Sequence, residues 1–373
     1  RGLTSLEDAV KTATGINVYR QGYQTRYQSR GFDIAQISEN GAHSTVCTMC
    51  GGNNPHDQRQ LMDMGLYDRV EIVRGATGLM KGQSEPGGSI NAILKKPTSM
   101  PQTVFDVLAD RWGRIRGSAD VSGTLSAAHQ VRGRAVAVAE HTEGFRQHDK
   151  GYNGLLYGVV DKSFGEDGQT KITAGAYIQR TKDQPALFGL PAAADGSDLR
   201  LPRNRYLGAD WNKTSYRKLS AFTELEHRFN DDWKLSATAV YTQNKSHTEY
   251  GYVPFRSNVS AAGTVSDGWL GRSDRYNHQW TFKADLEGKY PLFGRKHELY
   301  VGLNHSRERF NNLWRGSRLN GTYNILSWNG SELARPADWN NGTIKEIRQT
   351  TVTTKTATVA TRLNITDRLH LLG

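Results

Sequence analysis

Apolar and polar residues alternate along the chain from Gln102 onward, in one segment after another. In residues 171–179 every second side chain is apolar, and residues 279–287 repeat the pattern with Trp280 and Phe282 on one face. A period of two predicts β-strands with one apolar and one polar face. The segments run about 9–15 residues, the length that a tilted strand needs to cross a bilayer, whereas strands of soluble sheets average about 5–6.

The connections between these segments alternate in length. About ten strands are predicted, and they begin near Gln102, Arg114, Gln130, Tyr152, Gln169, Thr214, Trp233, Arg275, Lys296 and Ile347. Tight turns follow the even strands, at residues 126–129, 165–168, 230–232, 291–295 and 366–367. After the first hairpin, long loops follow the odd strands, at residues 143–151, 183–213, 250–274 and 311–346. Short turns on one rim and long loops on the other are typical of an outer-membrane β-barrel.

A barrel in a membrane must close, because an open edge would leave backbone groups without hydrogen-bond partners. Plugged barrels have about 22 strands, so this chain accounts for roughly half of one. The chain begins at Arg1 and ends where a strand-like segment, residues 368–372, has barely started. We therefore interpret it as lacking both ends of a longer protein.

The first hundred residues lack this regular alternation and combine helix and strand patterns, with a boundary near residues 97–101. Residues 5–12 are predicted as a short helix with Thr4 as a possible N-cap. Short strands are predicted at residues 16–19, 70–73 and 89–94. The predicted organisation is an α+β domain at 1–100 that fills the lumen, followed by the first half of an all-β transmembrane barrel at 101–373.

Composition refines this interpretation only slightly. The mean hydropathy is −0.65 with 36% hydrophobic residues, and no run of about 18 apolar residues occurs that could form a transmembrane helix. The net charge of +11 comes from basic residues that are scattered along the chain rather than gathered in a block. That distribution favours a cavity for anionic ligands over a nucleic-acid surface.

A series of glycines occupies the end of the first domain. Gly75, Gly78, Gly82, Gly87 and Gly88 lie between two strand-like segments, where glycine permits positive φ and close backbone approach. The two phosphate-binding patterns, G-x-x-x-x-G-K-[ST] and G-x-G-x-x-G, do not occur here, which excludes that interpretation.

Residues 67–97, YDRVEIVRGATGLMKGQSEPGGSINAILKKP, resemble the end of the plug domain of TonB-dependent receptors. Residues 6–18 resemble the early plug element of that family, and Arg30-Gly31-Phe32 matches its R-G-F signature. Asn40-Gly41 departs mildly from the usual D-G. The segment GATGLM at residues 75–80 most resembles the corresponding segment of hydroxamate-siderophore receptors of the coprogen and pyoverdine type.

The resemblance implies a monomeric transporter of the bacterial outer membrane, not an enzyme, that imports a ferric siderophore. It implies TonB, with ExbB and ExbD, as partner through an N-terminal segment that this sequence lacks. Outer-membrane lipid and lipopolysaccharide are the other expected partners, and nucleic acid is not one. We expect no permanently bound cofactor and no metal site, with the ferric siderophore as the transported ligand.

The resemblance also nominates plug residues that contact the ligand. Carried over by motif, these are Arg30 and the loop at 41–54, with His43 and Ser44. The Arg30 guanidinium would pair with anionic oxygens of a ferric chelate, or else form a salt bridge between plug and barrel.

Aromatic residues of the predicted loops are further candidates for contact with the chelate. They are Tyr206, Trp211, Tyr250, Tyr252, Phe255 and Trp314, together with Tyr177 on the polar face of its strand. Interface girdles explain some loop rings equally well, and Phe188 and Trp269 could pack loops together.

Cys47 and Cys50 are the only two cysteines and are expected to form a local disulfide. A zinc site that recruits His43 and His56, or redox chemistry at the C-x-x-C, are the alternatives.

Other functions stay open at this point. The same family includes importers of haem and cobalamin. A passive outer-membrane channel would lack the N-terminal domain, and a C-x-x-C oxidoreductase or a β-rich hydrolase would need a catalytic set that no residue spacing specifies.

Overall fold

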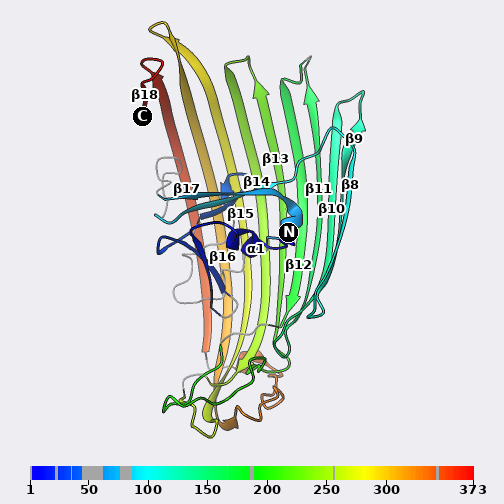
Figure 1. Cartoon of the computed structure of the whole chain (residues 1–373), viewed down its shortest axis with the longest axis vertical. Coiled ribbons are helices and arrows are strands. Elements are labelled where there is room, and N and C mark those ends of the chain that lie inside the picture. Colours follow the sequence, from blue (N-terminus) through cyan, green and yellow to red (C-terminus); the bar gives the residue numbers. More distant parts are fainter. Residues whose placement is uncertain are drawn as a thin grey trace.

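A large curved sheet carries a smaller domain on its concave side (Figure 1). The computed structural model describes residues 2–21, 24–34, 36–43, 62–75, 86–165, 167–184, 189–254, 257–341 and 344–373. Within these residues the large sheet has eleven strands in the order β18 to β8, and every neighbouring pair is antiparallel and adjacent in sequence. The strands are β8 (Gln102–Ala109), β9 (Ile115–Ser126), β10 (Val131–Glu143), β11 (Lys150–Phe164), β12 (Thr170–Asp183), β13 (Lys213–Arg228), β14 (Trp233–Tyr252), β15 (Thr264–Leu292), β16 (Arg295–Asn324), β17 (Ile344–Asn364) and β18 (His370–Leu372). This up-and-down meander confirms the predicted barrel wall.

The two faces of the wall differ in polarity, as the alternation of apolar and polar residues predicted. On the convex face, large apolar side chains are exposed, such as Phe105, Leu156, Trp280, Phe282 and Val359. On the concave face, polar side chains are buried, such as Thr173, Gln179, Ser220, Gln279 and Thr281. An apolar exterior around a polar interior is the arrangement of a barrel that faces lipid. No helix in the described part of the chain is long and apolar enough to cross a membrane.

Two strands extend much further than predicted. β15 begins at Thr264, and β16 continues to Asn324, so the prediction of loops throughout 250–274 and 311–346 was wrong. β15 and β16 stay paired along nearly their whole length, and the described residues between strands here are 253–254, 257–263 and 325–341. The apolar alternation fades beyond the lipid-facing band because water, not lipid, surrounds that part of the wall, while backbone pairing continues.

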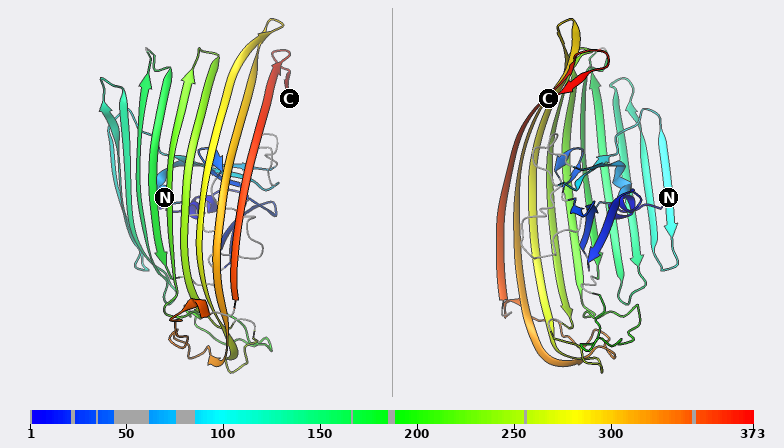
Figure 2. Two further views of the ribbon diagram at one scale, coloured as in Figure 1. Left: turned by 180° about the vertical axis from the view of Figure 1, so that it is seen from behind. Right: turned by 60° about the vertical axis from the view of Figure 1, so that its left-hand side comes forward.

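The N-terminal domain packs inside the curve of the wall (Figure 2). Its described residues form a helix, a 3-10 turn and two small sheets, ordered β1-β2-β3 and β5-β4-β7-β6, in which β4 and β7 are parallel. Its elements are α1 (Leu6–Lys11), β1 (Ile16–Gln21), β2 (Gln24–Ser29), β3 (Phe32–Asp33), β4 (Gln36–Glu39), β5 (Ala42–His43), η2 (Met64–Leu66), β6 (Tyr67–Arg74) and β7 (Gly88–Leu94). One hydrophobic core joins it to the wall, where Leu66 and Ile90 pack with Val136 and Leu155.

The helix and its N-cap each lie one residue later than predicted, since the helix begins at Leu6. Ser5, not Thr4, is the N-cap, and it forms a reciprocal capping box with Asp8. The Asp8 carboxylate also accepts hydrogen bonds from the backbone and hydroxyl of Thr4, so both residues stabilise the same helix start.

Two of the glycines are required by close backbone contact. A Cβ on Gly88, where φ is +124°, would lie 2.1 Å from the carbonyl oxygen of Val73. A Cβ on Gly87 would lie 2.5 Å from the carbonyl oxygen of Asp33. The glycine pair therefore lets β7 start against two neighbouring segments.

Candidate ligand-binding site

Four aromatic side chains form a cluster where β14, β15 and β16 approach the long loops. The aromatic cluster consists of Tyr250, Tyr252, Trp269 and Trp314. The two indoles are stacked, with ring centroids 5.6 Å apart and planes 11° apart, and the two phenol rings stack at 6.2 Å. The Trp314 Nε1–H donates a hydrogen bond of 3.1 Å to the Tyr250 hydroxyl oxygen, which joins the two stacks.

Two glycines give these rings room to lie against the wall. Gly271 pairs with Tyr250 on one side and with Gly316 on the other. A Cβ on Gly271 would lie 2.3 Å from the Tyr250 ring, and one on Gly316 would lie 2.6 Å from both Trp269 and Trp314. The cluster therefore depends on two side-chain-free positions in neighbouring strands, a feature that the sequence analysis missed.

The aromatic cluster faces the lumen, above the plug. Lys218 contacts the plug, so its side chain points into the lumen. Its register partner on β14 is Asn244, which points the same way. Tyr250 lies six residues further along β14 and therefore also faces the lumen. Tyr177 on β12 pairs with Ser220 on β13, which pairs with Thr242 on β14. Tyr250 lies eight residues beyond Thr242 along β14. At about 3.3 Å per residue this is a separation of roughly 26 Å. The aromatic cluster and Tyr177 thus occupy different levels of the lumen.

Tyr177 lies in the contact between plug and wall. Its hydroxyl donates a hydrogen bond of 2.7 Å to the Glu39 carboxylate, and the Lys218 Nζ lies 5.4 Å from its ring centroid. Glu39 also accepts hydrogen bonds of 2.5 Å from the Tyr67 hydroxyl and 2.6 Å from the Lys218 ammonium. The face predicted for Tyr177 is correct, but its polar group is engaged by the plug rather than presented to an open vestibule.

Tyr206 and Trp211 belong to a separate loop core. The Trp211 Nε1–H donates to the Leu333 carbonyl at 2.6 Å, which connects residues 189–212 to the loop at 325–341. The buried Tyr206 hydroxyl accepts a hydrogen bond of 2.7 Å from Asn212, and burial raises the pKa of this phenol. Both rings therefore stabilise the loop rim, and their contact with a ligand stays a prediction.

An ion-pair network fastens the second of these loops to the wall. The Arg335 guanidinium donates two hydrogen bonds, of 2.8 and 2.9 Å, to the Glu249 carboxylate, and Lys213 lies 3.0 Å from it. Burial alone would raise the pKa of Glu249, but the hydrogen bonds from Arg335 and Lys213 outweigh it and lower the pKa to about 2. Glu249 is therefore ionised near neutral pH, so its ion pair with Arg335 is present there.

The plug candidates are only partly described. Arg30 lies exposed in the turn between β2 and β3, in the left-handed region with φ of 52°. The backbone of His43 ends β5, while its side chain, Ser44, the cysteines Cys47 and Cys50, and Phe255 lie outside the described residues. The predicted disulfide and the predicted contacts of these residues stay predictions.

Among the aromatic candidates, the structure brings Tyr250, Tyr252 and Trp314 together. It adds Trp269, for which the sequence left loop packing open. Tyr250 and Tyr252 alternate with the same period on β14, but Trp314 lies on β16. The sequence could have placed all three on one face only if the full extent of β15 and β16 had been known.

Comparison with known proteins supports the architecture independently. The family profile described as TonB-dependent Receptor Plug Domain matches residues 1–89. The chain is 31% identical to the ferric-pyoverdine M114 receptor PbuA of Pseudomonas sp. strain M114, over 88% of this chain and 39% of that protein. It is 29% identical to the ferripyoverdine receptor of Pseudomonas aeruginosa, over 99% of this chain and 45% of that protein.

The solved structure of the P. aeruginosa receptor FpvA bound to a heterologous pyoverdine superposes with a TM-score of 0.88 at 26% identity. The match covers 100% of this chain and 48% of that one. The chain therefore spans less than half the length of these relatives.

Proposed function

Because the chain belongs to the TonB-dependent receptors of the bacterial outer membrane, we propose that it forms part of an importer of a ferric siderophore. The aromatic cluster supports this proposal, since its two stacked pairs of rings lie on the lumen wall between the plug and the long loops. Rings that carry hydroxyl and indole N–H groups can give a chelate both flat apolar surface and hydrogen bonds.

The class of siderophore is proposed from the relatives. Several carry names that state a ferric-pyoverdine receptor, and residues 75–80 resemble receptors of the hydroxamate type. We propose a hydroxamate-containing chelate of the pyoverdine type as the ligand. Import would require TonB with ExbB and ExbD to displace part of the plug after the chelate has bound.

Ligand titration of the outer-membrane protein that contains this chain tests the proposal. Ferric pyoverdine, ferric coprogen, ferrioxamine, haem and cobalamin would each be added to the protein in detergent while tryptophan fluorescence is recorded. We expect tight quenching by one hydroxamate-containing chelate. Binding of haem or cobalamin alone would replace the proposed substrate, and binding of none of them would favour a passive channel.

Two variants locate the site, and a third serves as their control. Trp314→Phe removes the indole N–H, and Gly316→Val pushes both indoles off the wall, so each should weaken chelate binding by about tenfold, given the ~0.5–1.5 kcal/mol that an aromatic pair contributes. Trp280→Phe changes an indole on the convex face, 49% exposed, and should leave binding unchanged. Equal affinity in all three variants would place the chelate elsewhere.

A further inference from the structure

Arg275 lies on the lumen face of β15, directly below the aromatic cluster. It shares this face with Gly271, the register partner of Tyr250, and with Ser273, the register partner of Trp314. Because side chains on one face of a strand recur at every second residue, Arg275 lies one step below the row of Trp314, roughly 7 Å along the strand. The arginine is buried, and the sequence analysis did not nominate it as a candidate.

The positive charge of Arg275 acts on the aromatic cluster. Burial raises the pKa of the Tyr250 phenol, and both the hydrogen bond from Trp314 and the charge of Arg275 oppose that rise. A single charge has such an effect at close range. The guanidinium of Arg275 therefore lies close beneath the rings, within reach of a ligand that rests against them.

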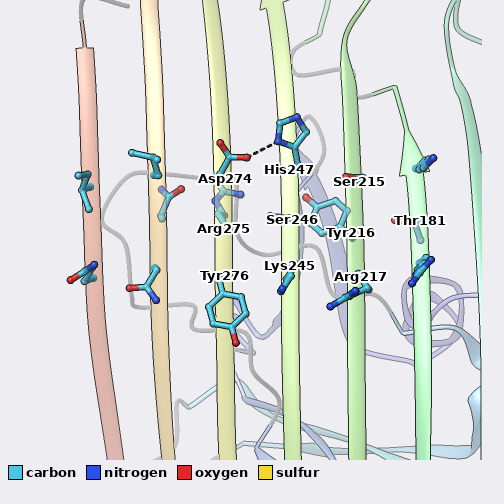
Figure 3. A pocket seen from close by; sticks show the side chains of 17 residues that line it. Thr181, Ser215, Tyr216, Arg217, Lys245, Ser246, His247, Asp274, Arg275 and Tyr276 are labelled. Carbon is cyan, nitrogen blue, oxygen red and sulfur yellow. Dashed lines mark hydrogen bonds and ion pairs between the residues drawn. The ribbon is translucent and has the colours of Figure 1, made fainter. Parts of the chain in front are cut away.

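The row that contains Arg275 offers further hydrogen-bonding groups. Its register partners are Ser246 on β14 and Asn312 on β16, and Figure 3 shows Arg275 on β15 beside Ser246. The Ser273 hydroxyl, one step nearer the rings, donates a hydrogen bond of 2.9 Å to the side-chain oxygen of Asn312, which orients that amide. Hydroxyl and amide groups thus surround the guanidinium on the lumen face.

Two other cations on the lumen face serve contacts within the protein. Lys218, one step nearer the plug, lies 2.6 Å from the Glu39 carboxylate, so the two charges neutralise each other. Arg348, in the row of Arg275 but two strands away on β17, forms an ion pair with Glu346 of its own strand. Neither of these cations lies as directly below the rings as Arg275 does.

Two carboxylates of the wall near Arg275 are directed elsewhere. Asp274, its neighbour in the sequence, points to the convex face, where it accepts a hydrogen bond of 2.6 Å from His247 (Figure 3). Glu308 shares the lumen face but lies two steps nearer the plug, where it accepts a hydrogen bond from Asn277. Neither carboxylate therefore competes with a ligand for Arg275.

We infer that Arg275 is a specificity-determining residue of the chelate site and selects ferric chelates with a net negative charge, an inference that rests on the proposed function. A guanidinium presents fork-shaped donors to anionic oxygens, and charge-assisted hydrogen bonds are about twice as strong as neutral ones. Three hydroxamates neutralise Fe³⁺, whereas a catecholate in place of one hydroxamate leaves a negative charge on the complex. A chelate of the second kind, seated against the rings, gains more from Arg275.

The test compares two chelates on the outer-membrane protein that contains this chain. Ferric pyoverdine is the catecholate-containing probe and ferric coprogen the neutral trihydroxamate, and tryptophan quenching in detergent reports the binding of each. Arg275→Gln should weaken binding of ferric pyoverdine by about tenfold to a hundredfold, because a hydrogen bond between charged groups is lost, and should weaken binding of ferric coprogen by a clearly smaller factor. Arg275→Lys keeps the charge without the fork, so its affinity for ferric pyoverdine should lie between those of the wild type and Arg275→Gln.

Arg217→Gln is the matched control. Arg217 belongs to the same part of the wall but points to the convex face, where its guanidinium donates a hydrogen bond of 3.1 Å to Gln243, so this variant should bind both chelates as the wild type does. Unchanged heat-modified gel mobility shows that each barrel has folded. Wild-type affinity for ferric pyoverdine in Arg275→Gln, or an equal loss for both chelates, would overturn the inference and leave the proposed function intact. If the wild type binds neither chelate, the proposed function fails and the inference falls with it.

Discussion

Lys218→Met removes the only ammonium group that contacts the buried Glu39 carboxylate in the described structure. Glu39 belongs to the plug and Lys218 to the wall, and their atoms are 2.6 Å apart in a buried environment. The hydroxyls of Tyr67 and Tyr177 complete the contact, one from each side. Methionine keeps the length of the lysine stem but leaves the carboxylate without its counter-charge.

Breaking a buried ion pair by removing one partner costs about 3–5 kcal/mol, because the remaining charge stays buried without compensation. At about 1.4 kcal/mol per tenfold change, the plug should separate from this part of the wall roughly two to three and a half orders of magnitude more often. Hydrogen exchange of backbone amides in β7, such as that of Ile90, measures this opening directly.

The defect should depend on pH. Burial by itself raises the pKa of Glu39, but the Lys218 charge and the hydrogen bonds from Lys218, Tyr67 and Tyr177 lower it below its usual value. A lowered pKa contributes stability above the unfolded value of about 4.3, and this contribution is lost as the pH falls. In Lys218→Met the pKa of Glu39 rises, so the carboxyl takes up a proton more readily and the difference from wild type should shrink between about pH 7 and pH 4.

Lys234→Met provides the comparison. Its ammonium lies 3.9 Å from Glu226 and its side chain is 43% exposed, so the change should cost less than about 1 kcal/mol. Wild-type exchange rates in Lys218→Met, or a defect of the same size at both pH values, would refute the assignment of this ion pair as a plug latch.

Two further outcomes follow from local geometry. Arg335→Gln should free the loop at 325–341 from Glu249 and raise its rate of proteolysis, and the wild-type loop should loosen in the same way only as the pH falls from about 4.3 toward the pKa of about 2. Gly88→Ala should lower the free energy of plug unfolding by more than about 1 kcal/mol, measured by urea titration, because its Cβ would meet the Val73 carbonyl at a backbone φ of +124°.

The wall could be predicted from the sequence wherever lipid imposes alternation. β8 to β14 begin within two residues of their predicted starts because apolar residues must alternate with polar ones in that band. β15 begins eleven residues before its predicted start at Arg275, because both faces beyond the band meet water or folded loops. Where a strand does not border lipid, backbone pairing continues, but the sequence shows no alternation of apolar and polar residues that would reveal the strand.

The plug latch could not be predicted in the same way. Glu39 and Lys218 are 179 residues apart, and neither belongs to a motif that specifies the other. Tyr177 was placed on the correct face by its parity, whereas its depth in the lumen, beside the plug, follows from strand register. Sequence alternation fixes which way a side chain points, and three-dimensional pairing fixes its neighbour.

The register between β13 and β14 determines which side chains of the wall face the plug, the lumen and the convex face. The same two strands present Lys218 to the plug, Tyr250 to the lumen, and Arg217 with Lys245 to the convex face. Because side chains alternate with a period of two, a slip of one residue would turn Lys218 to the convex face and Arg217 with Lys245 to the concave face. Such a slip would leave the Glu39 carboxylate buried without its counter-charge, so the ion pair between plug and wall also penalises the wrong pairing of the strands.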